Sequence, residues 1–191
     1  MLQVAEIFYS IQGEGTFTGK PAVFVRLAGC NLSCDFCDTD YSVKFFASVE
    51  DVVARVREIA ADCPMVVLTG GEPLAQCEAL DLIEALRLDK RRVHVESNGT
   101  IHTALPPDVW LCVSPKERVD ERMLQRADEV KLIVDERVPE EWLQRAHERQ
   151  VLLLQPEGNK PKNVALALDY VKAHPERLRL SLQTHKFIGA P

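Results

Sequence analysis

Three cysteines on one short segment are the residues of this chain best suited to chemistry. Cys30, Cys34 and Cys37 lie in CNLSCDFCDTDYS, directly after an apolar run, with no fourth cysteine nearby. Thiolates hold iron–sulfur clusters, and a four-iron cluster normally takes four of them, so three would leave one iron open for another molecule. On spacing alone, zinc held by these cysteines and a histidine, for example His94 or His185, is the alternative.

Five further polar segments each follow an apolar run of the strand type. They are TGGEP after MVVLT, ESNGT after VHV, SPK after VWLCV, QPEGN after VLLL and QTHK after RLSL. In parallel α/β folds the carboxyl ends of the strands share one edge, and ligands bind there. The sequence therefore predicts an enzyme whose six polar segments converge on one mouth.

Strand-like runs alternate with amphipathic helical patterns along the chain. Strands are predicted over residues 4–10, 22–29, 65–69, 92–97, 109–114, 129–134, 151–155 and 179–183, and helices over residues 48–61, 74–88, 139–150 and 162–174. Ser48 is the expected N-cap of the first helix, with Asp51 in a capping-box position. The alternation predicts βαβ units and a mostly parallel sheet.

The length limits how complete such a sheet can be. A complete eightfold (β/α) barrel takes about 250 residues, whereas this chain has 191. We therefore expect an α/β fold built as an incomplete, partly open parallel (β/α) barrel with trimmed helices. No linker or repeat is visible, which predicts a single domain over residues 1–191.

Composition narrows the class of partner. The formal net charge is −6 and no basic run is present, which argues against nucleic acid and favours a small-molecule substrate. No apolar run approaches the roughly 20 residues of a membrane span, and the N-terminus lacks a signal-peptide pattern. We expect a cytoplasmic protein without a membrane partner, whose thiols stay reduced.

CxxxCxxC after a strand, with GGEP after the next strand, resembles the radical S-adenosylmethionine superfamily. The resemblance implies that Cys30, Cys34 and Cys37 hold a four-iron, four-sulfur (4Fe-4S) cluster, which reduces S-adenosylmethionine to give a 5′-deoxyadenosyl radical. Each position that matches the cofactor-binding residues of relatives is alone compatible with an ordinary turn. These positions are Gly71, Glu72, Glu96, Asn98, Ser114, Pro115, Lys116, Gln155 and Pro156.

A longer set of motifs is more specific. EIFYSIQGEGTFTGKPAVFVRLAGCNLSCDFCDT, together with TGGEP, ESNGT, SPK, QP and SLQTHKFIGAP, closely resembles the 7-carboxy-7-deazaguanine synthase family. This implies a lyase that converts 6-carboxy-5,6,7,8-tetrahydropterin to 7-carboxy-7-deazaguanine with loss of ammonia, in queuosine and 7-deazapurine biosynthesis. It also implies assistance by Mg²⁺, a homodimer, and an electron donor such as flavodoxin or ferredoxin.

The resemblance also implies which residues contact the substrate and the magnesium ion. Thr39 matches the family's magnesium ligand, and Asp38 and Asp40 are expected to be turn or second-layer residues. Arg26 lies within the apolar run AVFVRLAG, where its fork would suit a substrate carboxylate, the alternative being a solvent-facing arginine. The expected substrate-binding residues are Ile11, Gln12, Gly13, Glu14, Arg26, Thr69, His185 and Pro191.

The C-terminal segment HKFIGAP is apolar for a chain end. We expect it to fold over the site and bury Phe187 and Ile188, so that the carboxylate of Pro191 accepts hydrogen bonds from the pterin. Packing for stability alone is the alternative. The cysteines outside the motif, Cys63, Cys77 and Cys112, are expected to be small buried hydrophobic residues.

Two rival functions explain part of this pattern. A glycyl-radical activating enzyme shares the cluster motif but has no need of Arg26 or of the QGEG segment. A zinc-stabilised binding module explains the cysteines alone and leaves TGGEP and SPK without a role.

Overall fold

The computed structural model describes residues 1–191 and divides the chain into two compact units. The first unit contains Met1–Ser10, Pro21–Ser97 and Ile101–Leu111, and the second contains Ile11–Lys20, Asn98–Thr100 and Cys112–Pro191. The short segment 11–20 therefore belongs with the C-terminal half of the chain. No helix in the structure is long and apolar enough to cross a membrane.

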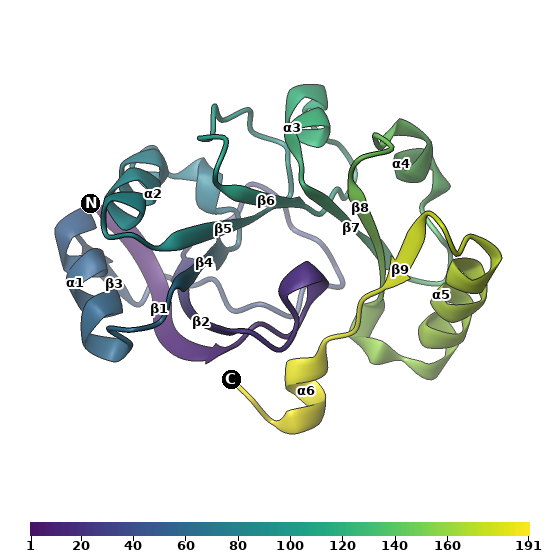
Figure 1. The fold of residues 1–191 in the computed structure, drawn as a ribbon, viewed down its shortest axis with the longest axis horizontal. Helices are drawn as coiled ribbons and strands as arrows, with labels where there is room; N and C mark the ends of the chain where they lie inside the picture. Colours follow the sequence, from purple (N-terminus) through teal and green to yellow (C-terminus); the bar gives the residue numbers. More distant parts are fainter. The chain divides into compact units, whose positions relative to one another are not determined.

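The first unit contains strands in the order β3 (Phe45–Ala47), β1 (Leu2–Ile11), β2 (Pro21–Leu27), β4 (Met65–Gly70) and β5 (Arg92–Ser97) (Figure 1). β3 pairs antiparallel with β1, whereas β2, β4 and β5 are parallel neighbours. Helices α1 (Val49–Ile59) and α2 (Ala79–Leu88) lie side by side, and the short helix η2 (Pro73–Ala75) follows β4.

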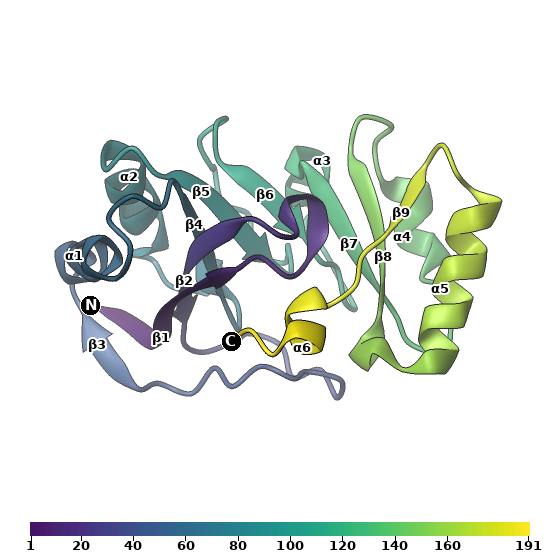
Figure 2. The same cartoon turned by 60° about the horizontal axis from the view of Figure 1, so that its bottom comes forward.

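The second unit is built on four neighbouring strands, β6 (Trp110–Val113), β7 (Glu129–Val134), β8 (Val151–Pro156) and β9 (Leu178–Leu180). All three pairings are parallel, and β6 begins in the first unit. Helix α5 (Pro161–Ala173) packs on β8 and β9 (Figure 2). The remaining helices are short: η1 (Gly15–Phe17), α3 (Glu121–Arg126), α4 (Glu140–Arg145), η3 (Glu157–Asn159) and α6 (Thr184–Ile188).

Helix α1 forms where the sequence predicts it. The Ser48 hydroxyl accepts the Asp51 N–H at 3.1 Å, and the Asp51 carboxylate accepts the Ser48 N–H at 3.2 Å. These two bonds close the expected capping box. The Ser48 hydroxyl also donates to Asp51 Oδ2 at 2.7 Å, and this bond, together with the one from the Ser48 N–H, lowers the pKa of Asp51. Val52, Val53 and Val56 form the buried stripe of the helix.

Two predicted helices are shorter than their patterns. The second begins only at Ala79, because the Gln76 amide bonds the backbone of Gln3 and Ala28 and so belongs to a turn. The third, predicted over residues 139–150, ends at Arg145, because the Arg177 guanidinium holds the carbonyls of residues 146, 147 and 148 outside the helix. β3, α3 and α6 were not predicted.

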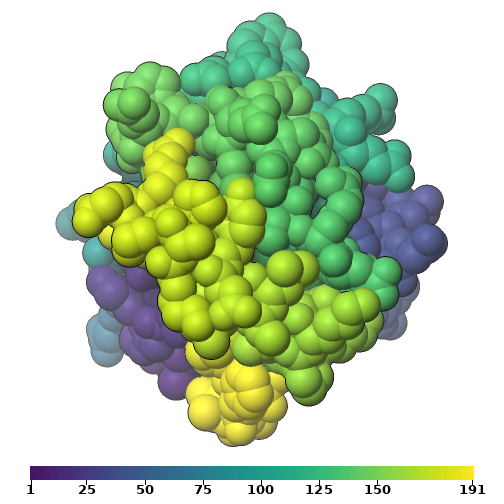
Figure 3. Space-filling model, turned by 90° about the vertical axis from the view of Figure 1, so that its right-hand side faces the viewer, coloured from purple at the N-terminus to yellow at the C-terminus, as the bar shows by residue number.

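Two predictions of burial are wrong. Cys63 and Cys112 are buried as expected, but Cys77 is exposed, and its thiol donates to Glu78 Oε2 at 3.1 Å. That bond to Glu78 raises the pKa of the Cys77 thiol. Phe187 and Ile188 are 67% and 63% exposed, because α6 protrudes from its face of the second unit at the yellow end of the chain (Figure 3).

Candidate functional site

The cysteine segment is an irregular loop that follows β2. All three cysteines are free thiols; Cys30 and Cys34 are half-buried and Cys37 is exposed. The Cys37 N–H donates to the carbonyl of Cys34 at 3.0 Å, and the Leu32 N–H donates to Cys30 Sγ at 3.4 Å. An N–H directed at sulfur is the kind of contact that tunes a cluster thiolate. Three accessible, unbridged thiols on one loop fit a cluster held by three protein ligands.

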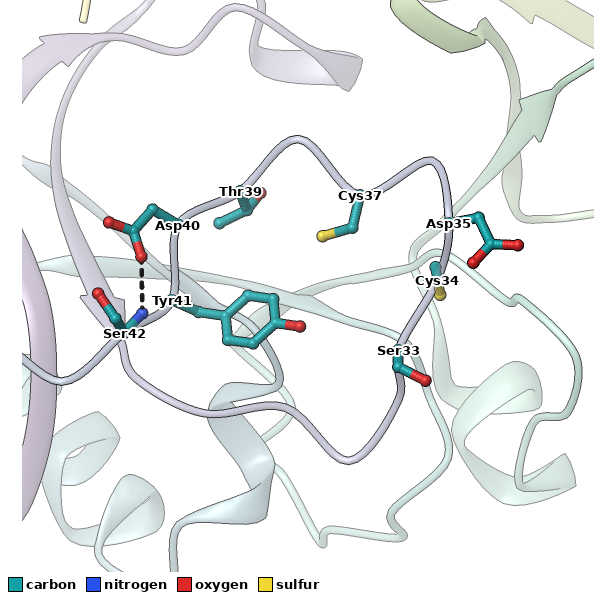
Figure 4. A pocket seen from close by; sticks show the side chains of 8 residues that line it. All are labelled: Ser33, Cys34, Asp35, Cys37, Thr39, Asp40, Tyr41 and Ser42. Atoms are coloured by element: carbon teal, nitrogen blue, oxygen red, sulfur yellow. Dashed lines mark hydrogen bonds between the residues drawn. The ribbon is translucent and has the colours of Figure 1, made fainter.

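The same loop encloses an open concavity of about 490 Å³ (Figure 4). The sulfur of Cys37 and the ring of Tyr41 point toward the inside of the loop. Thiols, hydroxyls and carboxylates line the concavity, which suits metal ions and polar ligands. The lining residues are Ser33, Cys34, Asp35, Cys37, Thr39, Asp40, Tyr41 and Ser42.

The side chain of Asp40 stabilises a turn of this loop. Its carboxylate accepts the Ser42 N–H at 2.9 Å and the Lys44 ammonium at 3.0 Å. Hydrogen bonds from Ser42, with a further one from Lys44, hold the pKa of Asp40 well below its usual range. The turn role expected for Asp40 agrees with this geometry, and Thr39 lines the concavity.

The glycine pair at the end of β4, Gly70 and Gly71, lets the GGEP turn touch the start of the cysteine loop. The Glu72 N–H donates to the carbonyl of Gly29 at 3.0 Å, and a Cβ on Gly71 would lie 2.7 Å from Cys30 Cβ. A Cβ on Gly70, whose φ is +148°, would lie 2.1 Å from the carbonyl oxygen of Leu27. Glycine is therefore required at both positions, and it fixes the GGEP turn against Cys30.

Glu72 joins the ends of two strands. Its Oε1 accepts the Leu74 N–H and the Ser97 hydroxyl, both at 3.0 Å, and the residue has no exposed surface. The first bond caps η2, and the second ties the end of β5 to the GGEP turn. The carboxylate thus holds the backbone from which the expected cofactor-binding segments project.

A polar row crosses three strands of the first unit. Arg26 on β2 is in register with Thr69 on β4, and the register of β4 with β5 continues this row to Glu96. Arg26 is neither solvent-facing nor enclosed: its side chain is 21% exposed, and its Nε lies 2.5 Å from Glu6 Oε1. His94 Nε2 lies 3.4 Å from Glu96 Oε1 on β5.

In the second unit, the QGEG segment lies against the residues that follow β9. The carbonyl of Gly13 accepts both the N–H and the hydroxyl of Thr184 at 2.9 Å. Within the segment, Gln12 Oε1 accepts the Glu14 N–H at 3.1 Å. The structure thus brings the expected substrate residues Gln12, Gly13 and Glu14 together with the segment that carries His185. Ile11 and Pro191 are exposed.

Two buried charged residues of β7 hold this segment and were not predicted. Lys131 Nζ lies 2.6 Å from Glu14 Oε2, and Glu129 Oε2 accepts the Thr16 N–H at 3.0 Å. The signal was present in EVKLIV, where two charged residues at alternate positions interrupt an apolar strand. Because side chains at alternate positions of a strand point to the same face of the sheet, Glu129 and Lys131 both reach this segment.

The expected cofactor-binding residues of the second unit lie in the same hydrogen-bonded region. The Ser114 hydroxyl donates to the carbonyl of Lys131 at 2.8 Å and accepts from Lys116 at 2.6 Å. The Ser181 hydroxyl donates to Gln155 Oε1 at 3.0 Å and accepts the Gly15 N–H at 3.1 Å.

The remaining expected cofactor-binding residues of this region are Asn98, Pro115 and Pro156. Asn98 Oδ1 accepts from the N–H of Thr100 at 2.9 Å and from its hydroxyl at 2.6 Å, and so closes the ESNGT turn. Pro115 is buried next to Ser114, and Pro156 ends β8.

Comparisons with known proteins agree with these observations. The family model of the radical SAM superfamily matches residues 24–136. A 7-carboxy-7-deazaguanine synthase of Bacteroides thetaiotaomicron is 41% identical, with 98% of each chain covered. One from Bradyrhizobium diazoefficiens is 40% identical, with 97% of each covered.

Solved structures agree as well. The crystal structure of QueE from Escherichia coli matches with a TM-score of 0.82 and 29% identity, covering 96% of this chain and 94% of that one. The crystal structure of Streptococcus suis SuiB bound to precursor peptide SuiA, at 11% identity and a TM-score of 0.60, matches 80% of this chain and 46% of that one, and shares the fold alone.

These matches confirm the incomplete, partly open parallel (β/α) barrel and the radical SAM activity predicted from the sequence. The 4Fe-4S cluster, S-adenosylmethionine and Mg²⁺ are the cofactors, and the enzyme is a lyase that forms 7-carboxy-7-deazaguanine in the queuosine pathway. It acts on a small molecule and needs a reductant. The zinc-stabilised binding module is thereby rejected. The chain belongs to the 7-carboxy-7-deazaguanine synthase family.

Proposed function

We propose that this chain converts 6-carboxy-5,6,7,8-tetrahydropterin to 7-carboxy-7-deazaguanine with loss of ammonia, and that the residues named above bind the substrate and cofactors. The observation that carries the proposal is the seating of the QGEG segment on Thr184, beside His185. A glycyl-radical activating enzyme, which acts on a protein, has no need of this arrangement.

Cys30, Cys34 and Cys37 hold the cluster in this proposal. Bound together, the cluster and S-adenosylmethionine supply the radical that abstracts a substrate hydrogen, a task that proteins leave to cofactors. The chain itself orients and shields them. Gly71 and Glu72 fix the backbone beside Cys30, and the remaining cofactor contacts come from Glu96, Asn98, Ser114, Pro115, Lys116, Gln155 and Pro156.

Arg26 binds the carboxylate of the substrate. Its planar guanidinium can donate hydrogen bonds to a second carboxylate besides that of Glu6, and Thr69 offers a hydroxyl in the neighbouring register position. The pterin ring is bound by the backbone of Ile11, Gln12, Gly13 and Glu14, by His185 and by the Pro191 carboxylate.

Thr39 supplies a hydroxyl oxygen to magnesium, a hard cation that usually keeps several waters. The remaining parts of the proposal are a homodimer, an electron donor such as flavodoxin or ferredoxin, and a cytoplasmic location. The cytoplasmic location is supported by the cluster thiolates, because they have to stay unoxidised and the cytoplasm keeps thiols reduced.

Anaerobic turnover tests the function. The reconstituted protein is given the carboxylated pterin, S-adenosylmethionine, Mg²⁺ and a reductant, and the products are identified by mass spectrometry. We expect 7-carboxy-7-deazaguanine and ammonia in equal amounts, and neither from a Cys37→Ala control. Cleavage of S-adenosylmethionine without pterin conversion would contradict the proposal.

A further inference from the structure

Both carboxylate oxygens of Glu14 are engaged within the second unit. Oε2 lies 2.6 Å from Lys131 Nζ, and Oε1 accepts the Gln183 Nε2–H at 3.0 Å. The side chains of Glu14 and Lys131 are only 17% and 8% exposed. A carboxylate held from two sides in this way fixes the backbone from which it projects.

The two partners of Glu14 belong to different elements. Lys131 lies on β7, in the interior of a parallel sheet, and Gln183 lies between β9 and α6. The amide of Gln183 is itself fixed, since its Oε1 accepts from Lys186 Nζ at 2.9 Å. Glu14 therefore ties the QGEG segment both to a rigid strand and to the start of the C-terminal segment.

The charge of Lys131 also matters for an anionic substrate. Without the ammonium, the QGEG segment would present the negative charge of Glu14 next to a pterin that carries a carboxylate. Like charges in a poorly solvated site repel strongly. Pairing with Lys131 removes that repulsion and leaves the carbonyls and N–H groups of the segment as its polar surface.

We propose that Lys131 is a positioning residue for the substrate. It anchors the Glu14 carboxylate, so that the backbone of Gly13 and Glu14 is held in the conformation that binds the pterin, and Glu14 contributes through its main chain. The inference rests on the proposed function and deepens it. It assigns a role to two residues, Lys131 and Gln183, that are not among the expected site residues.

Variants at both ends of the ion pair test the anchor. Lys131→Met removes the ammonium and retains the length of the side chain, Glu14→Gln removes the charge, and the double variant removes both. We expect each single variant to raise the KM for the pterin at least tenfold, with a smaller change in kcat and unchanged iron content. The double variant should be no worse than the worse single variant, because both changes break one interaction.

Hydrogen exchange of the backbone amides of residues 13–16 provides a readout that needs no substrate. Lys131→Met should speed this exchange at least tenfold, whereas exchange in β4, in the other unit, stays as in the parent. Lys162→Met is the matched control, because Lys162 forms an exposed ion pair with Glu136 in the same unit. It should leave both the KM and the exchange unchanged.

The outcomes separate the anchor from the proposed function. A parent enzyme that does not convert the pterin would overturn the function, and the exchange measurement would still decide the role of Lys131. An active parent, with normal KM and unchanged exchange in Lys131→Met, would overturn the anchor. If Lys131→Met does not fold, Glu14→Gln decides by the same two measurements.

Discussion

The imidazole of His185 lies directly on Gly13. A Cβ placed on Gly13 would be 2.1 Å from His185 Nδ1, so no other residue fits there without displacing the ring. The carbonyl of the same glycine holds Thr184. The start of α6 is therefore positioned by one residue near the beginning of the chain.

Gly13→Ala should displace the His185 ring. Overpacking of this kind costs about 1–3 kcal/mol, and we expect a lower melting temperature together with a higher KM for the pterin. Combining it with His185→Ala removes the clash and should recover the stability but not the KM. Thermal unfolding and steady-state kinetics measure the two effects. Unchanged stability of Gly13→Ala would show that the ring is free to move.

Alanine at Cys30, Cys34 or Cys37 should abolish the cluster, because each supplies one of three protein thiolates. Iron content and the visible spectrum after anaerobic reconstitution are the measurements. Cys77→Ala is the matched control, since Cys77 is an exposed free thiol of the same unit, and it should retain full iron. Stoichiometric tight zinc without iron uptake in the parent would falsify this assignment.

Arg26→Lys keeps the positive charge but loses the fork. Loss of a charge-assisted contact costs about 1.5–3 kcal/mol, which corresponds to roughly a ten- to hundredfold weaker binding of the pterin. Glu6→Gln is the control: it removes the present partner of Arg26 and should not weaken substrate binding. Equal affinity of Arg26→Ala and the parent would exclude Arg26 from the site.

Thr39→Ala should lower turnover and blunt the response to added Mg²⁺ while the iron content stays unchanged. Asp40→Asn serves as the comparison, because the Asp40 carboxylate is engaged by Ser42 and Lys44. We expect that variant to respond to Mg²⁺ as the parent does. A titration of activity against Mg²⁺ decides, and an unaltered response of Thr39→Ala would place the cation elsewhere.

Extension of the chain beyond Pro191 moves the terminal carboxylate and leaves every internal side chain in place. We expect a marked rise in the KM for the pterin with retained binding of S-adenosylmethionine. The exposure of Phe187 and Ile188 makes this test cleaner, because an added tail has no buried packing to disturb. Normal kinetics of a C-terminally extended enzyme would remove Pro191 from the substrate contacts.

The parts of the fold that follow from local pattern were predictable. Alternating strands and helices, and the capping box of Ser48 and Asp51, rest on neighbouring residues and appear as expected. The helix boundaries near Gln76 and Arg145 differ from the prediction, because hydrogen bonds to groups that are distant in the sequence determine them. Local propensity carries no information about such bonds.

The residues of the candidate site also include some that could be predicted from the sequence and some that could not. Motif residues such as Cys30 and Gly71 could be found from spacing, and the contact between them explains why the motif needs a glycine. Lys131 could not be assigned, since its partner Glu14 is 117 positions away along the chain. The exposure of Phe187 was mispredicted because apolar character alone does not determine what covers a side chain.

The anchoring of the segment 11–20 on β7 and on residues 181–184 has a consequence for synthesis. Its hydrogen bonds to Ser181 and Thr184 span 166 and 171 positions. The N-terminal part of a chain emerges first during synthesis, and a contact cannot form before both of its residues have been made. The QGEG segment is thus translated among the first residues but completed among the last, so a truncated chain lacks these partners and cannot hold the substrate in this way.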